Sequence, residues 1–276
     1  MLSTGNSLGN IRHCRQGFGK ERSQKTVEVA NLIQNALDTG APYQHRMARY
    51  LFEIACLDGL EKLSVDRTLP TSFLVYFQKV MELLDKSLTF SVGQLRHAGL
   101  TVQCRRECSH CCYQMPTGIS TAELVYIYHG MQRSGADSKF FRRCLEAEEL
   151  WVEVFHQQTN DQRVPGGSSG FMELVSKAYR TLENPCPFLQ GRICQIYPYR
   201  PLACRIHFSL TPPHWCRPSH FQNAHASRFN LEPGKCVFDA LEKVEKRFQL
   251  DLSDVMVCGL LELTVNVMQF QKIRWV

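Results

Sequence analysis

The sequence predicts a mainly α-helical protein whose helices pack around an irregular, cysteine-rich, metal-binding centre, with few or no β-strands. Apolar residues recur at helical spacing on both sides of that centre. The centre itself is dense in cysteine, proline, tyrosine and arginine and has no amphipathic period. A chain of 276 residues, 44% of them hydrophobic, is long enough to bury a core without disulfides.

Residues 26–98 are expected to form a helical subdomain that precedes the clustered cysteines. The apolar spacing from Val27 predicts a helix that stops at Gly40, and a second helix is expected from about Tyr43 to Leu57. A third follows Pro70, with apolar residues at helical spacing as far as Leu88.

Residues 99–230 are expected to form the cysteine-cluster metal-binding domain. Ser120 and Glu123 have the spacing of a capping box that opens a helix, and further helices are predicted from Asp137 and over 171–182. The segment from Leu189 to Cys194 is typical of a tight turn between short extended pieces. Residues 231–276 are expected to supply C-terminal helices that pack on the core, split near Leu250 and with Ser253 as the second cap.

The net charge of +6 is unevenly distributed along the chain. Residues 1–25 supply +4 of it, and we interpret them as a disordered basic tail, although a transit peptide would look similar. The remaining +2 is too little to indicate a nucleic-acid surface. The tail has no apolar core of a secretory signal, and no apolar run is long enough to predict a membrane span. We therefore expect a cytoplasmic protein.

Thirteen cysteines are many for this length, and eight of them fall into two segments. In a reducing compartment, clustered thiolates bind zinc, copper(I) or iron–sulfur clusters more often than they form disulfides. The predicted metal ligands are Cys104, Cys108, Cys111, Cys112, Cys186, Cys194, Cys204 and Cys216. Cys56, Cys144 and Cys258 lie within helical patterns and are expected in the core, whereas Cys14 is interpreted as incidental and Cys236 stays open.

The adjacent pair Cys111 and Cys112 bears on the kind of centre. Neighbouring residues of an extended chain point to opposite sides, so two such sulfurs on one tetrahedral ion would strain the backbone. The pair therefore favours one ligand with one bystander, or sulfurs that serve different metals, as in a cluster or two nearby centres.

Arg200 and Arg205 flank Cys204 and are the predicted cofactor-binding residues, because guanidinium groups donate hydrogen bonds to thiolates or cluster sulfides. They could equally bind an anionic substrate or pair with surface glutamates. His110 and the histidines near Cys216 could complete a mixed zinc site, or they could be exposed loop residues.

These motifs resemble a known family. Cys108-Ser-His-Cys111-Cys112, then Cys186-Pro-Phe-Leu, Gly191-Arg-Ile-Cys194-Gln-Ile-Tyr197 and Arg200-Pro-Leu-Ala-Cys204-Arg205 are similar to the YkgJ-type CxxCxxCC cysteine-cluster family. The resemblance covers about residues 100–220 and implies a zinc- or iron-chelating domain. The gap from Cys104 to Cys108 is three residues where the family usually has two. A more distant likeness is to flagellin lysine N-methylases.

Two functions are compatible with this pattern. In the first, the protein is a metalloprotein whose iron–sulfur cluster or zinc is structural, and it acts as an interaction or scaffolding module. In the second, an open coordination position makes it a metal-cluster-dependent enzyme that modifies a protein side chain or a small molecule. The chain has no nucleotide-binding signature of the P-loop or Rossmann type. Spacing alone does not choose between zinc and iron–sulfur, since both accept sets of four cysteines.

Overall fold

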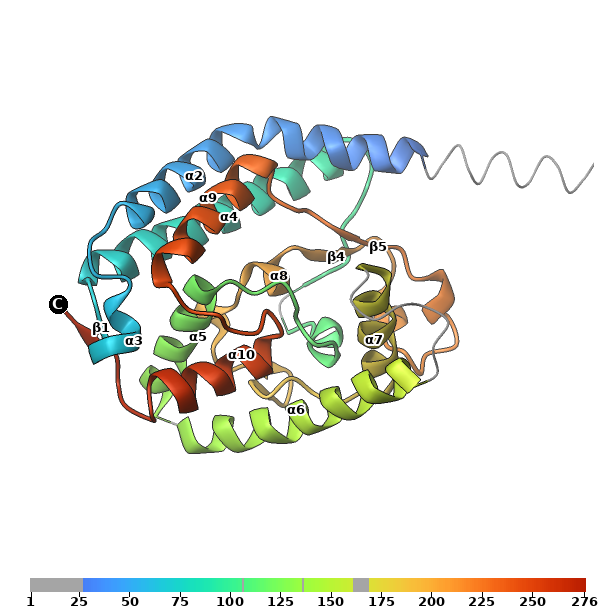
Figure 1. The fold of residues 1–276 in the computed structure, drawn as a ribbon. Helices are drawn as coiled ribbons and strands as arrows, with labels where there is room; N and C mark the ends of the chain where they lie inside the picture. The colour runs from blue at the N-terminus through green and yellow to red at the C-terminus, as the bar shows by residue number, and fades with distance from the viewer. Residues whose placement is uncertain (1–26, 106, 136, 161–168) are drawn as a thin grey trace, which may run out of the picture.

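The computed structural model describes residues 27–105, 107–135, 137–160 and 169–276. Within them the fold is mainly α-helical with short two-stranded pairings, as predicted (Figure 1). The predicted basic tail, with Cys14, lies outside the described residues.

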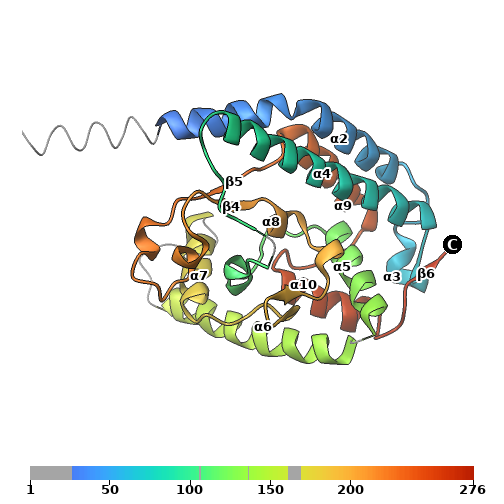
Figure 2. The ribbon, with the colours of Figure 1, turned by 180° about the vertical axis from the view of Figure 1, so that it is seen from behind.

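One layer of the molecule consists of helices from both ends of the chain. A first helix over 27–39 is followed by α2 (Ala41–Ala55) and α4 (Thr71–His97), and α2 packs along both α4 and α9 (Lys235–Phe248). Figures 1 and 2 show these helices side by side along one edge of the molecule. The rings of Phe73 and Phe248, both fully buried, meet edge to face with centroids 5.7 Å apart. The first C-terminal helix thus completes the N-terminal helical layer.

A second group of helices surrounds the cysteine-rich centre. It consists of α5 (Thr121–Ser134), α6 (Asp137–Asn160), α7 (Ser169–Thr181) and α10 (Met256–Glu262), with α10 continuing into a π-helical turn. Helix α5 contacts α4, α9, α6 and α10, so it joins the two groups. This position explains why every residue from Thr121 to Tyr128 is buried.

The predicted capping box is present at the start of α5. The Ser120 hydroxyl accepts from the Glu123 backbone N–H, and the Glu123 carboxylate accepts from the Ser120 N–H at 3.0 Å. Ser253 does not take the predicted cap position. Helix α10 begins after Val255, whose N–H donates to the Ser253 hydroxyl at 3.2 Å.

The centre of the chain consists of short elements joined by irregular segments. The predicted tight turn is an antiparallel hairpin of β2 (Leu189–Gln190) and β3 (Ile193–Cys194), with Gly191 at a φ of 62° that glycine adopts without strain. β4 (His207–Ser209) pairs antiparallel with β5 (Arg228–Asn230). The remaining short elements are η1 (His110–Tyr113), η2 (Tyr197–Tyr199), α8 (Leu202–Arg205), η3 (Pro213–Cys216) and η4 (Asn223–His225).

The C-terminus closes back onto the helical layer. β6 (Arg274–Trp275) pairs in parallel with β1 (Thr68–Leu69), which follows the short helix α3 (Lys62–Asp66), and the chain ends beside them in Figure 1. Across the part of the chain that the structure describes, none of the helices has the length and apolar character needed to cross a bilayer.

A candidate metal centre

Six of the eight predicted ligands line one cavity of about 580 Å³. They are Cys108, Cys111, Cys112, Cys186, Cys194 and Cys204. The six cysteines themselves span 96 positions of the sequence, from Cys108 to Cys204. The rest of its wall combines a few polar side chains, including Gln114 and His207, with apolar ones such as Phe188 and Met256.

The first cysteine segment is held in a tight turn. Cys111 and Cys112 lie in the 3₁₀ helix η1, and the Cys112 N–H donates to the Ser109 carbonyl at 2.9 Å. The expectation that neighbouring sulfurs point to opposite sides was wrong, because a 3₁₀ helix turns by about a third of a circle per residue, where an extended strand turns by half. Both thiols line the cavity, and that of Cys112 donates a hydrogen bond to the sulfur of Cys111.

The second cysteine segment is tied directly to the first. The backbone N–H of Cys186 donates to the carbonyl of Cys112 at 2.7 Å. From α6, Arg143 donates to the carbonyls of Cys186 and Leu189 at 3.2 and 2.9 Å. The β2–β3 hairpin then places Cys194 in the cavity wall, and the short helix α8 places Cys204 there.

Three of the cavity sulfurs accept a backbone hydrogen bond from the residue two positions further on. The N–H of His110 donates to Cys108, that of Phe188 to Cys186, and that of Ile196 to Cys194. Such bonds stabilise the thiolate form and orient the sulfur, as the outer hydrogen bonds of metal sites do. The local backbone therefore suits these cysteines to be thiolate ligands.

Burial is the main influence on the protonation of three of the six cavity thiols. Burial raises the pKa of Cys186 to about 12 and also raises the pKa values of Cys194 and Cys204. By contrast, a hydrogen bond from Cys104 lowers the pKa of Cys108 to about 6. A cation in the cavity would relieve the cost of ionising the buried thiols, since metal binding displaces their protons. Soft sulfur donors of this kind fit zinc and iron.

The other predicted ligands lie beside the cavity without lining it. The Cys104 thiol contacts Cys108. Cys216 ends η3, which packs against η1, and its carbonyl accepts a hydrogen bond from Arg180. Among the cysteines expected in the core, Cys144 is buried and Cys258 is half-buried. Cys56 is exposed, because it follows the last turn of α2 and points away from the core, so that expectation was wrong.

The cysteines surround the cavity without converging on one point. Within the described residues, no three Cys, His, Asp or Glu side chains are placed to hold a single metal ion. Four sulfurs around one zinc, at a Zn–S distance of about 2.3 Å, lie only about 3.8 Å from one another.

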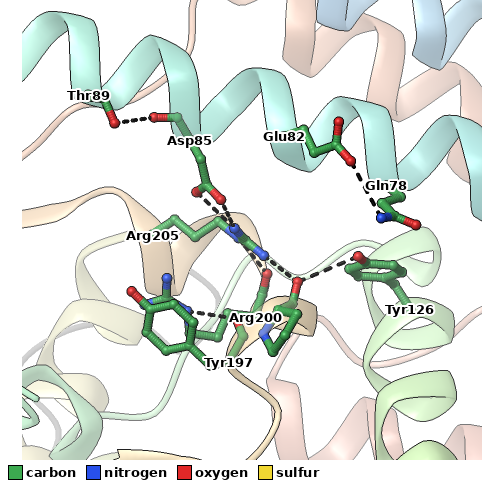
Figure 3. Close-up of polar contacts among 9 residues, drawn as sticks. Gln78, Glu82, Asp85, Thr89, Tyr126, Tyr197, Arg200 and Arg205 are labelled. Atoms are coloured by element: carbon green, nitrogen blue, oxygen red, sulfur yellow. Dashed lines mark hydrogen bonds and ion pairs between the residues drawn. The ribbon is translucent and has the colours of Figure 1, made fainter. Parts of the chain in front are cut away.

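The two predicted arginines have different positions. Arg200 lines the cavity, with its guanidinium 3.6 Å from the centroid of the Tyr197 ring and its Nε donating to the Tyr197 carbonyl at 3.1 Å. Arg205 is buried and is not part of the cavity wall. Its side chain donates to Asp85 on α4 and to the carbonyls of Pro198 and Arg200 (Figure 3). Arg205 thus fixes the chain that carries Arg200.

Of the histidines, His207 lines the cavity, and its ring bonds to Gln114 at 2.9 Å and to Asn230. Both ring nitrogens are therefore engaged. His214 and His220 contact each other edge to face, outside the cavity wall. Burial lowers the pKa of His110, which precedes the cysteine pair in η1.

Sequence reasoning missed Arg192 and Glu107, which also line the cavity. Arg192 follows Gly191 in the turn of the β2–β3 hairpin, between two cysteines of the cavity. A residue in a turn between two candidate ligands is expected to lie near the metal site, and this position in the sequence could have identified Arg192.

The fold and this cavity define a mainly α-helical protein with a thiol-lined site for a soft metal. Residues 103–237 match the family model CxxCxxCC, described as "Putative zinc- or iron-chelating domain". The match supports metal binding, with zinc or iron as the metal. The matched range contains all eight predicted ligands. Neither the curated proteins nor the solved structures gave a match, so the likeness to flagellin lysine N-methylases gains no support from them.

Proposed function

We propose that this protein is a metalloprotein whose cavity cysteines hold a polynuclear thiolate centre, with an iron–sulfur cluster preferred over zinc. The observation that carries the proposal is the convergence of six cysteines from separate segments on one cavity. A single tetrahedral ion uses four ligands, whereas clusters distribute their thiolates over several metal atoms. Within the described residues no three of these side chains are placed to hold one ion, which fits several metal atoms better than a single ion.

The proposed ligands are the six cysteines of the wall, with Cys104 and Cys216 as outer residues. When bound, the centre would supply positive charge that compensates the buried thiolates, and in the iron–sulfur case a one-electron couple. The chain contributes the backbone N–H groups that donate to three of the sulfurs and the guanidinium group of Arg200. Hydrogen bonds to the sulfurs influence the reduction potential of such a centre.

Elemental analysis of protein purified without oxygen tests this proposal. We expect several iron atoms and acid-labile sulfide per chain, with a brown colour and absorption near about 400 nm. Cys111→Ser and Cys194→Ser should each lower the metal content, while the exposed Cys56→Ser serves as the matched control. A colourless protein with stoichiometric zinc would exclude the cluster, and unchanged metal content in both cavity variants would exclude the site.

A second candidate is a metal-cluster-dependent enzyme that modifies a protein side chain, for example with lysine N-methylase-like activity. The cavity volume favours it, since about 580 Å³ leaves room beside a metal centre for a reacting group. The number of protein ligands on each metal distinguishes the structural metalloprotein from the enzyme. X-ray absorption that gives four sulfurs per metal supports a closed, structural centre, and a light-atom ligand on one metal supports an open, catalytic one.

We also propose a cytoplasmic location. Every cysteine in the described ranges is a free thiol, as expected for a reducing compartment. Thiol labelling of the protein in intact cells should find the cysteines reduced, and a disulfide-bonded form in freshly lysed cells would contradict this.

A further inference from the structure

The cavity has the dimensions of a small-molecule site. Pockets that hold small ligands are usually about 300–1,000 Å³ and combine an apolar lining with a few polar groups that fix orientation. This cavity, at about 580 Å³, has that composition outside its cysteines, with Phe188, Ile196 and Met256 among its apolar lining and Arg192 and Arg200 among its charged groups.

Arg200 is held in a fixed orientation with hydrogen-bonding capacity to spare. Its plane lies on the Tyr197 ring and its Nε is bonded to a carbonyl, which leaves its terminal nitrogens for another acceptor. A guanidinium fixed in this way loses little rotational freedom on binding a carboxylate. Within the described ranges, neither Arg200 nor Arg192 forms an ion pair with an acidic side chain. Arg205 and Arg217, in contrast, pair with Asp85 and Glu183.

The wall near these arginines exposes apolar surface. Ile193, in the β2–β3 hairpin, is 58% exposed, and Tyr197 is 55% exposed, and both line the cavity. Glu107 is the acidic side chain of the described wall, and it is outnumbered by the two arginines. An anion with an apolar body would therefore match both the charge and the exposed surface.

We propose that the cavity binds a small carboxylic acid with an apolar body, whose carboxylate pairs with Arg192 and Arg200 beside the metal centre. This inference rests on the proposed function for its placement beside the metal, and it names the class of ligand that the same site would bind. The competing explanation is that both arginines act only on the cysteines. The charge of Arg200 partly opposes the burial that raises the pKa of Cys194, and the charge of Arg192 adds to the hydrogen bond from Cys104 that lowers the pKa of Cys108. In that case their loss would release metal and leave no acid-binding site.

Calorimetric titration of the full chain, purified without oxygen, tests the proposal with butanoate, hexanoate, octanoate and benzoate as probes. Hexan-1-ol is the neutral counterpart of hexanoate. We expect at least one acid to bind saturably, and the matching alcohol to bind at least about tenfold more weakly, as the loss of one charge-assisted hydrogen bond implies. Arg192→Gln and Arg200→Gln should each weaken acid binding about tenfold, and metal content is measured in the same samples. Arg96→Gln, an exposed arginine outside the cavity, should leave binding unchanged.

Three results would overturn the inference: no acid binds, the alcohol binds as well as the acid, or the double variant Arg192→Gln/Arg200→Gln binds the acid as tightly as the unaltered protein. Loss of metal in the arginine variants without an acid-binding defect would support the competing explanation and reject ours. Elemental analysis of the same samples tests the proposed function separately. Metal-free protein that still binds the acid through both arginines would contradict the metal centre while retaining the acid site.

Discussion

The buried guanidinium of Arg205 donates to both carboxylate oxygens of Asp85, at 2.8 and 2.7 Å, across 120 positions of sequence. Asp85 lies on α4 of the helical layer, and Arg205 ends α8 beside the cavity. The other nitrogens of Arg205 hold the carbonyls of Pro198 and Arg200, so one side chain connects the helical layer to the cavity wall (Figure 3). The contribution of this connection to the free energy of unfolding can be measured.

Asp85→Asn should destabilise the fold by about 1–2 kcal/mol. The Arg205 side chain is 4% exposed and would keep its charge without a carboxylate partner, but Asp85 is 54% exposed, so water screens part of the loss. Urea unfolding measures the change. Glu82→Gln, which removes an exposed ion pair with Lys79 on the same helix, is the control and should cost less. Equal stability of the two variants would show that the Arg205–Asp85 contact contributes no more than the exposed ion pair of Glu82 and Lys79.

Gly130→Ala should destabilise the protein by about 1–3 kcal/mol and lower its metal content. An added Cβ on this residue of α5 would lie 2.5 Å from Cγ of Tyr199, and that ring belongs to η2, which leads into Arg200. Gly93→Ala on α4 is the matched control, because its Cβ meets no atom within 4 Å. It should stabilise the helix by about 0.5–1 kcal/mol. A neutral Gly130→Ala would mean that Tyr199 moves away without cost.

Glu123 should make stability fall as the pH rises above the usual glutamate range. Burial raises the pKa of this carboxyl, while the N–H groups of Ser120 and Leu202 and the Ser120 hydroxyl oppose the rise. The folded state therefore holds its proton at pH values where the unfolded state has lost it, so the free energy of unfolding declines from about pH 4.5 upward through the raised pKa. Above that pKa the decline attributable to Glu123 stops.

Urea unfolding at a series of pH values checks this dependence. In Glu123→Gln the part of the pH dependence that is due to this carboxyl should vanish. The difference in free energy of unfolding between the variant and the unaltered protein should therefore change with pH from about pH 4.5 up to the raised pKa. A difference that is constant with pH would contradict the raised pKa.

Removal of the metal should destabilise the protein. Metal that binds only the folded state adds about 2.7 kcal/mol when its free concentration is 100 times the Kd. Thermal unfolding with and without a chelator measures the effect. The chelator should have little influence on Cys204→Ser if that variant no longer binds metal. An unchanged Tm in the unaltered protein would show that the cavity forms without metal.

Cys104→Ser and Cys216→Ser should retain more metal than any variant of the six wall cysteines, because neither residue lines the cavity. For Cys104, the expected effect is on the protonation of Cys108, because the Cys104 thiol donates to Cys108 and lowers the pKa of that cysteine. As the pH is lowered, Cys104→Ala, which removes this donor where serine would keep one, should lose metal at a higher pH than the unaltered protein. Complete loss of metal in Cys216→Ser would instead make it a ligand.

The sequence by itself determined the fold class, most of the helices and the presence of a soft-metal site. Helical spacing is a local property, as is the capping box of Ser120 and Glu123, so both can be read from neighbouring residues. The soft-ligand argument depends only on residue type and density. The hairpin before Cys194 was also predictable, because Gly191 is the residue that a turn with positive φ favours.

Tertiary structure decided which of these residues share a cavity. The side-by-side placement of Cys112 and Cys186 depends on a backbone hydrogen bond between segments 74 positions apart, and no local pattern encodes it. The same holds for Arg200 and Arg205, which flank one cysteine in sequence but face different surroundings. Arg200 lies on the Tyr197 ring in the cavity wall, whereas Arg205 donates to Asp85 on α4. Burial and long-range charge pairing, which depend on the packed chain as a whole, separate their roles.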